Sequence, residues 1–304
     1  QELSKMWSRC WQWACREEHL PEVGDHYVYD IGPYSVIVAR IARDEIKAFI
    51  NSCTHRGTRL LGDEGVGHGQ GFSCPFHGWS WHLNGVLKEV PGHWDFPHVC
   101  EASHSLQPVA CDSWQGFVFI NLDPDASPLH EQLDVLPDHF AHFPLDQRRI
   151  RLHVQKVLPA NWKAAQEAFM EAYHNFTTHD SPTGGNAQYD IFGPHASRFI
   201  HTIGHYSPES LADYPGDKWR APPLTEQELL AGLPVTQRPL AEGETARAAG
   251  AQLLREEMGG QLGVDFSAVS DSEMLDSIEY HLFPNAFFFP GRLISMAYRF
   301  RPLG

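Results

Sequence analysis

The chain has 304 residues, 42% of them apolar, and a formal net charge of −15, so it is long enough for two ordinary domains with a core in each. The acidic balance argues against a nucleic-acid partner, because phosphate binding needs clustered Lys and Arg that this sequence lacks. No apolar run approaches the roughly 20 residues of a membrane span and the N-terminus has no signal core, so we expect no membrane association and a cytoplasmic location. Six cysteines are too few for a disulfide scaffold, whereas nineteen histidines point to metal ligation.

The first half of the chain predicts a helix followed by a small all-β domain. Ser4 to Arg16 carries apolar residues at helical spacing behind a Ser4 cap, which predicts an amphipathic helix. From His26 to about Leu122, short β-rich runs are broken by Gly, Pro and Asp. The runs include residues 35–40, 46–51 and 116–122. We therefore expect an N-terminal helix within residues 1–22 that packs on the later domain, and a β domain over residues 23–148.

Residues 149–304 predict a second domain that combines a sheet with helices, so the fold class is α+β. A covering region is expected between residues 207 and 276, where Thr225 and Glu228 form a capping-box pattern. The predicted strands are 150–158, 198–206, 278–282, 286–289 and 293–300, and a helix is predicted over 161–173.

Two short motifs each pair one cysteine with one histidine. Cys53 and His55 form a Cys-x-His motif, Cys74 and His77 form a Cys-x-x-His motif, and eighteen residues separate them. Both motifs are expected on loops of the β domain, so the four side chains can converge on one cofactor. Two thiolates on one iron and two neutral imidazoles on the other raise the potential of a [2Fe–2S] cluster to about −150 to +300 mV. A Cys2His2 zinc site uses the same ligand types, but zinc fingers keep Cys–Cys and His–His pairs separate.

These residues resemble the Rieske domain of ring-hydroxylating oxygenase large subunits. The matching stretches are Cys53-Thr-His-Arg-Gly57 with Leu60, and Cys74-Pro-Phe-His-Gly-Trp79 with Gly85. Rieske proteins of respiratory complexes usually have a disulfide between these loops, and no further cysteine stands beside either motif here. The oxygenase type is therefore favoured. The resemblance implies an antiparallel-β Rieske domain and a helix-grip catalytic domain, made of an antiparallel sheet with helices.

A second metal site is predicted on the helix that begins near Asn161. The stretch from Asn161 to His174, continuing to His179, resembles the mononuclear-iron helix of the same family. Ferrous iron that binds O2 beside a substrate uses two histidines and one carboxylate on one face. Glu171 and His174 are three residues apart and share a helix face. His179 lies five residues further on, so the helix must end or unwind before it. We predict that His174 and His179 bind the iron.

Other histidines are weaker candidates for the iron site. His201 and His205 form a rival pair, but their segment alternates like a strand, so we interpret them as pocket-lining or structural. His139, His142 and His281 have no carboxylate in register and are expected at the surface or in the core. The substrate pocket is expected to be largely apolar. Its predicted lining residues are Phe169, Ala172, Asn175, Phe176 and residues of the last strands.

Glu171 stands where members of the family have an Asp or Glu between the cluster and the iron. The resemblance implies a homotrimer, or an α3β3 assembly, in which the cluster of one subunit lies beside the iron of its neighbour. This carboxylate would then bond a histidine ligand from each side, orient both imidazoles and provide a path for electrons. The alternative is an ordinary exposed helix glutamate. Ala168 replaces an Asn that is common here in the family, so the hydrogen bonds around the iron are expected to differ.

The carboxylate that would complete the iron site is not found in the sequence. In the family the third ligand is an aspartate beyond the final strands, and no acidic residue of this chain matches it. Asp180 is the nearest carboxylate to His179 in the sequence, but it is expected to point away on an extended chain. Both Gln1 and Gly304 fall where the family continues. We therefore expect a fragment whose catalytic domain is truncated at the C-terminus.

The resemblance implies the oxygenase component of a multicomponent enzyme. Electrons from an NAD(P)H-dependent reductase, with or without a ferredoxin, would pass through the cluster to Fe(II). O2 would then be activated to mono- or dioxygenate an aromatic or other apolar substrate. Oxidative demethylation or C–N cleavage of a quaternary amine stays open, because Glu at position 171 also suits that branch. The chain could also be a Rieske electron-transfer protein without oxygenase activity, or a catalytically inactive truncated subunit.

Overall fold

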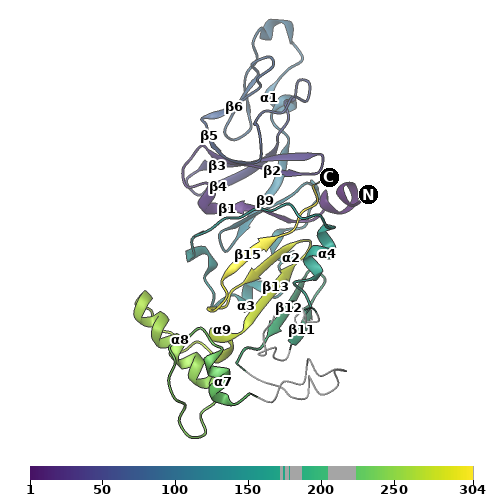
Figure 1. Ribbon diagram of the computed structural model, residues 1–304. Coiled ribbons are helices and arrows are strands. Elements are labelled where there is room, and N and C mark those ends of the chain that lie inside the picture. Colours follow the sequence, from purple (N-terminus) through teal and green to yellow (C-terminus); the bar gives the residue numbers. More distant parts are fainter. Residues whose placement is uncertain (172–173, 175–177, 179–186, 205–223, 304) are drawn as a thin grey trace. The chain divides into compact units, whose positions relative to one another are not determined.

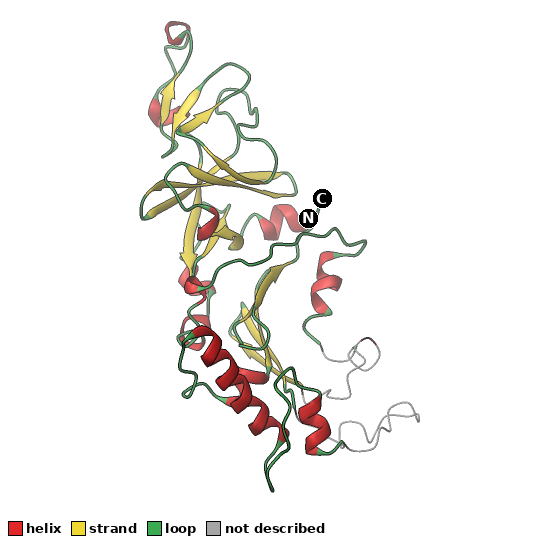
Figure 2. Cartoon of the chain, turned by 60° about the vertical axis from the view of Figure 1, so that its left-hand side comes forward, coloured by secondary structure: helices red, strands yellow, loops and turns green. Residues whose placement is uncertain are grey.

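The computed structural model describes residues 1–171, 174, 178, 187–204 and 224–303. The chain forms two compact units. The first comprises residues 1–133, 144–157 and 301–304, and the second comprises residues 134–143 and 158–300. Antiparallel sheets make up the frame of each unit (Figures 1 and 2). None of the helices in the described part could cross a lipid bilayer.

The first unit is built on a seven-stranded and a three-stranded sheet. The larger sheet has the order β1-β10-β9-β4-β3-β2-β5, and the smaller has the order β6-β7-β8. The strands are β1 (Gln12–Arg16), β2 (Asp25–Ile31), β3 (Tyr34–Ala42), β4 (Glu45–Ile50), β5 (Gly65–His68), β6 (Gly71–Ser73), β7 (Ser80–His82), β8 (Leu87–Glu89), β9 (Pro108–Trp114) and β10 (Phe117–Asn121). The short helices are η1 (Leu3–Trp7), η2 (Glu17–His19), η3 (His93–Asp95), α1 (Glu101–His104), α2 (Leu129–Gln132) and η4 (Leu145–Gln147).

The predicted β domain is confirmed, but the predicted helix from Ser4 to Arg16 is wrong after its first turns. The helical segment η1 ends at Trp7, and β1 pairs antiparallel with β10. Strand β1 has three buried residues in succession at its end. A strand that is covered on both faces does not alternate, so its apolar pattern cannot be told from that of a short buried helix. The division into residues 1–22, 23–148 and 149–304 stays a prediction.

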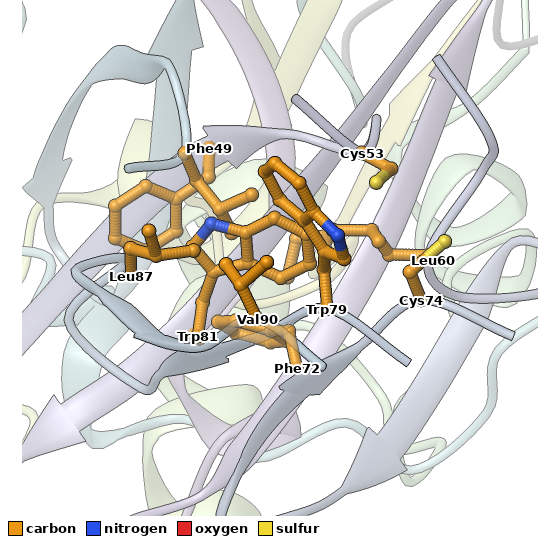
Figure 3. Packing of buried hydrophobic residues seen from close by; sticks show 12 residues of the cluster. Phe49, Cys53, Leu60, Phe72, Cys74, Trp79, Trp81, Leu87 and Val90 are labelled. Carbon is orange, nitrogen blue, oxygen red and sulfur yellow. The ribbon is translucent and has the colours of Figure 1, made fainter. Parts of the chain in front are cut away.

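A core of aromatic and aliphatic side chains supports the loops that carry the Cys–His motifs. Its members are Ile37, Ala39, Phe49, Cys53, Leu60, Phe72, Cys74, Trp79, Trp81, Leu87, Val90 and Leu106, all of them buried. Figure 3 shows the sulfur atoms of Cys53 and Cys74 at one end of this core, beside Leu60 and Trp79. Close packing against this core therefore restrains the positions of the two cysteines.

The second unit is a five-stranded antiparallel sheet of order β11-β12-β13-β14-β15, accompanied by helices. The strands are β11 (Ala187–Phe192), β12 (Ala196–His201), β13 (Ser277–Leu282), β14 (Ala286–Phe289) and β15 (Met296–Arg299). The helices are α3 (Leu136–His139), α4 (Trp162–Glu167), α7 (Glu226–Ala231), α8 (Ala246–Leu262) and α9 (Asp271–Leu275). Helices α7, α8 and α9 lie together beside one end of the sheet (Figure 1).

The α+β class of the chain is confirmed, as are the strands over 278–282 and 286–289 and the capping box at Thr225; the strand predicted over 293–300 is confirmed in part, since β15 spans Met296–Arg299. The predicted strand over 198–206 is confirmed in part, since β12 ends at His201. The strand predicted over residues 150–158 is wrong, because these residues join no sheet of the described chain. Alternation alone predicts a strand, but the strand forms only where a neighbouring strand takes up its backbone hydrogen bonds.

Helix α8 is joined to the start of β13 by an ion pair whose carboxylate is buried and whose arginine is partly exposed. Arg247 donates two hydrogen bonds to the carboxylate of Asp276, at 2.6 and 2.8 Å. Asp276 is 2% exposed and also accepts from the N–H of Ile203 at 3.0 Å and from Ser272 at 2.6 Å. A buried carboxylate with this many donors is satisfied, whereas a buried unpaired one is costly. These bonds hold Asp276 directly before Ser277, where β13 begins.

Candidate metal centres

The two Cys–His loops are closed by the same pattern of backbone hydrogen bonds. The N–H of Cys53 donates to the carbonyl oxygen five residues on, at 2.8 Å, and the N–H of Gly57 donates back to the carbonyl of Cys53, at 2.8 Å. The N–H groups of Cys74 and Gly78 repeat this arrangement at 2.7 and 3.0 Å. The glycines have φ of 76° and 73°, a left-handed conformation that side chains disfavour. The repeated turn places each cysteine alike.

The two cysteines face each other at the buried side of the loops. Cys53 and Cys74 are each 3% exposed, their thiols hydrogen-bond to one another, and neither is in a disulfide. Burial alone would raise the pKa of Cys74, but hydrogen bonds from the backbone N–H groups of His77 and Phe76 outweigh it and hold that pKa below its usual value. The thiolate is the form that binds metal, so the loop is suited to ligation.

The two histidines are also brought together. The ring centroids of His55 and His77 are 4.8 Å apart. The Nδ1 atom of His55 is buried and has no hydrogen-bond partner among the described residues, which is a costly state for a ring nitrogen unless it binds a metal. Trp79 stacks on the ring of His55, with centroids 4.8 Å apart and planes 5° apart. This contact restrains the orientation of the imidazole.

The arrangement fits a [2Fe–2S] cluster. A Rieske cluster takes two thiolates on one iron and two imidazoles on the other. The structure pairs sulfur with sulfur and imidazole with imidazole, on two matching turns. The orphaned Nδ1 of His55 supplies the free nitrogen that such a ligand needs. The identity of the four ligands stays a proposal.

The helix predicted over residues 161–173 is shorter in the structure. Asn161 caps α4 by accepting from the N–H of Lys163 at 3.0 Å, and the helix ends at Glu167. The N–H groups of Phe169 and Met170 then donate to carbonyls three residues back. These tighter i→i+3 turns end the helix early, before the histidines predicted to bind iron.

Glu171 and His174 contact each other within the chain. Oε1 of Glu171 lies 2.5 Å from Nδ1 of His174, and Oε2 accepts from the backbone N–H of His174 at 3.0 Å. A carboxylate on one ring nitrogen orients the imidazole and leaves the other nitrogen, Nε2, for a metal. His179, the second predicted ligand, lies outside the described residues, as do Asp180 and His205. Within the described residues no group of three His, Cys, Asp or Glu side chains could hold a metal ion.

A cavity of about 10 Å³ lies in the second unit between Met170 and the sheet. That volume holds about one water molecule. Its lining residues are Met170, Tyr189, Ser197, Phe199, Glu279, His281 and Phe287. The predicted lining residue Phe169 does not border the cavity, since its ring packs on Tyr298 and Phe300 at 4.9 and 5.5 Å. Ala172, Asn175 and Phe176 lie outside the described residues.

Sequence reasoning missed one chemically important member of this cavity, Glu279. It is 4% exposed and accepts a hydrogen bond of 2.5 Å from the hydroxyl of Tyr298. Burial raises the pKa of Glu279 to about 8. The signal in the sequence was an acidic residue inside an otherwise uncharged strand, Ser277–Leu282.

His281 lines the same cavity, on the same face of β13 as Glu279. Its Nε2 lies 3.5 Å from Nε2 of Gln166 and 3.4 Å from the carbonyl oxygen of Pro284. Burial lowers the pKa of His281 to about 4, so the ring is neutral at pH 7. His281 is therefore partly buried and forms part of the wall of this cavity.

Comparison with known families decides what these motifs belong to. Residues 10–99 match the Rieske [2Fe–2S] domain, and residues 143–304 match the catalytic domain of the ring-hydroxylating alpha subunit. The chain belongs to the ring-hydroxylating alpha-subunit family. It therefore carries a Rieske [2Fe–2S] domain and a catalytic domain of the type that binds mononuclear iron in this family. The predicted family, cofactors and fold class are confirmed.

Two relatives and one solved structure illustrate the range of this family. The biphenyl 2,3-dioxygenase subunit alpha of Rhodococcus jostii (strain RHA1) is 32% identical over 185 residues, which is 59% of this chain and 40% of the relative. The carnitine monooxygenase oxygenase subunit of Escherichia coli (strain K12) is 28% identical over 175 residues, or 57% of this chain and 46% of the relative. The chain thus spans less than half the length of these relatives.

The fold resemblance extends over the whole chain. The structure of naphthalene 1,2-dioxygenase from Rhodococcus sp. bound to indole matches with a TM-score of 0.66 and 24% identity, covering 100% of this chain and 67% of that one. At this level of identity the match supports the fold, and the residue roles rest on the geometry of this alpha-subunit chain.

Proposed function

We propose that this alpha-subunit chain is the terminal oxygenase component of a Rieske oxygenase. In this proposal Cys53, His55, Cys74 and His77 hold the [2Fe–2S] cluster, and His174 and His179 hold a mononuclear Fe(II). The cluster supplies single electrons at a moderate potential, and the mononuclear iron supplies O2 activation. The observation that carries the proposal is the pair of matching Cys–His turns, with an orphaned buried nitrogen on His55.

The residues of the chain have separate tasks in this function. The backbone N–H groups of the second loop stabilise the thiolate of Cys74, and Trp79 holds the ring of His55 by stacking. Glu171 fixes the proton of His174 on Nδ1 and so directs Nε2 to the metal. Its further role as a bridge to a neighbouring subunit, in a homotrimer or α3β3 assembly, belongs to the same proposal.

We infer the substrate class from the residues that line the cavity and from the relatives. Phe199, Phe287 and Met170 present apolar surface beside the iron-binding segment, which favours an aromatic or other apolar substrate. Oxidation of a quaternary amine is the second candidate, because a carnitine monooxygenase subunit is among the relatives. We infer that the electrons come from an NAD(P)H-dependent reductase, directly or through a ferredoxin.

Metal analysis and spectroscopy test the cluster directly. The reduced protein should give a Rieske-type electron paramagnetic resonance spectrum, with about two irons and two sulfides per chain in the cluster. His55→Ala should abolish that spectrum, whereas His68→Ala, at an exposed histidine of the same unit, should not. Zinc without labile sulfide would exclude the cluster and with it the proposed function.

Turnover separates an oxygenase from an electron carrier. The protein with excess Fe(II), a matched reductase and 18O2 should incorporate label into at least one compound of a panel of aromatic hydrocarbons and quaternary amines. Reduction of the cluster without label in any compound, and without a third iron, would instead support a role in electron transfer alone.

A further inference from the structure

Glu279 is a buried carboxyl group that the proposed electron path and metal ligation do not use. It lines the cavity beside Met170 and accepts a hydrogen bond from the hydroxyl of Tyr298. No Lys, Arg or His side chain of the described part forms an ion pair with it. An ionised carboxylate in such a place is unfavourable until a positive charge comes beside it.

Arg198, a cation of the same sheet, lies on the face opposite Glu279. Arg198 on β12 lies opposite Tyr280 in the strand register, whereas Phe199 lies opposite Glu279. Arg198 therefore projects to the other face, where it bonds the carboxylate of Asp190 at 2.6 Å. Among the described residues, no side chain supplies the charge that would balance Glu279, and a bound molecule can supply it.

Aromatic side chains line the cavity together with the carboxyl group. The rings of Tyr189 and Phe199 have centroids 4.9 Å apart, and those of Phe287 and Tyr298 are stacked at 4.8 Å. Tyr189, Phe199 and Phe287 line the cavity with Glu279. The faces of such rings attract cations, and the attraction grows where water is excluded. A carboxylate beside aromatic rings can thus offer two kinds of favourable contact to one positive charge.

We propose that Glu279 binds a protonated amino group of the substrate, so that the preferred substrates are aromatic or apolar amines. This inference rests on the proposed oxygenase function and names a substrate class for it. The cavity of about 10 Å³ has room for one water molecule, and an ammonium group is of similar size. An ammonium can also donate hydrogen bonds to Glu279 and to the hydroxyl of Ser197, whereas a trimethylammonium group is larger and has no N–H.

The titratable groups that face Glu279 make the binding pH-dependent in one direction. Tyr189 has its pKa raised to about 12, the pKa of Tyr298 is raised by burial, and that of His281 is lowered to about 4. Glu171 is a second carboxylate near Tyr189. None of the tyrosines changes charge between pH 6 and 8, and neither does His281, so the pH dependence of the affinity comes from Glu279. A bound ammonium should displace the proton of Glu279. The affinity should therefore rise about tenfold per pH unit until pH 8.

Calorimetric binding to the iron-loaded protein tests the proposal without turnover. The probes are benzylamine, benzyl alcohol and benzyltrimethylammonium. At pH 7 benzylamine should bind at least tenfold more tightly than the other two, and its heat should vary with the ionisation enthalpy of the buffer because close to one proton is released. Glu279→Gln should weaken benzylamine binding on the order of 100-fold and remove the buffer dependence. Glu242→Gln, at an exposed position of the same unit, should change neither.

Two results would overturn the proposal. Equal binding of benzylamine and benzyl alcohol by the wild-type protein needs no variant and would show that the charge is not recognised. An unchanged benzylamine affinity in folded Glu279→Gln would show that another group binds it. Either result would leave the oxygenase function intact if neutral aromatic compounds still incorporate label. Tight, Glu279-dependent binding without label in any compound would support the binding site while contradicting the oxygenase function.

Discussion

Replacement of Glu171 by Gln tests the contact that orients His174. The change keeps the shape of the side chain but removes the negative charge that lies 2.5 Å from Nδ1 of His174. Loss of such a support to a metal-bound histidine weakens metal binding about 10- to 100-fold, which corresponds to about 1.4 to 2.7 kcal/mol at 25 °C. We expect Glu171→Gln to hold Fe(II) more weakly by this factor.

Electron transfer should suffer more than iron binding. With iron in excess, both metal centres of Glu171→Gln should be filled, and the cluster spectrum should be that of the wild type. If Glu171 also joins the centres of adjacent subunits, reoxidation of the reduced cluster in a single turnover with substrate and O2 should nearly stop. The measurements are Fe(II) retention against a chelator and the absorbance of the cluster after mixing.

A matched control lies one turn earlier. Glu167 is an exposed carboxylate at the end of α4, so Glu167→Gln removes the same charge from the same segment without touching His174. Wild-type iron retention and wild-type reoxidation in Glu171→Gln would refute the reasoning. A loss of equal size in both variants would point to the general charge of the segment instead of the Glu171–His174 contact.

Three further predictions concern stability and pH. Asp276→Asn removes the charge of the partly exposed pair with Arg247, so the free energy of unfolding should fall by about 2 kcal/mol in urea titrations. A change below about 0.5 kcal/mol would contradict the importance of that pair. Gly78→Ala places a side chain at φ 73° and should cost about 1 kcal/mol or more with loss of cluster on heating, whereas Gly62→Ala, in open space without a positive φ, should not. The pKa of Glu279 is raised from 4.5 to about 8, so its side chain binds more protons in the folded state than in the unfolded state between these values. Below about pH 6.5 the lowered pKa of His281 acts in the opposite direction, so the fall in stability from Glu279 should show between about pH 6.5 and 8, by at most about 1.4 kcal/mol per pH unit, and it should be absent in Glu279→Gln.

The residues that the sequence predicted well are close together in the chain. Each Cys–His motif lies within one turn, and each turn needs a glycine at one position for a left-handed φ, so the spacing of Cys53, His55 and Gly57 already contains the geometry. The same holds for Glu171 and His174, which are three residues apart and do meet. Local spacing determines local contacts, whatever the rest of the fold does.

Errors arose where a neighbouring segment decides the structure. Gln12–Arg16 is a strand because β10 pairs with it, and an apolar run of five residues does not show in advance that a partner exists. Residues 150–158 alternate without joining a described sheet. Helix α4 ends early because tighter turns follow Glu167, and helix boundaries are weakly encoded in a pattern of apolar residues.

Glu279 shows why the specificity of the site is harder to predict than its chemistry. The hydroxyl that bonds it belongs to Tyr298, nineteen residues later, and reaches it only because β13, β14 and β15 pair in the observed register. A shift of one residue in either pairing would turn one of these side chains to the opposite face. In sequence Glu279 is one acidic residue among many in a chain of net charge −15. It becomes a candidate for substrate recognition only when the sheet removes it from water and leaves Arg198 on the other side.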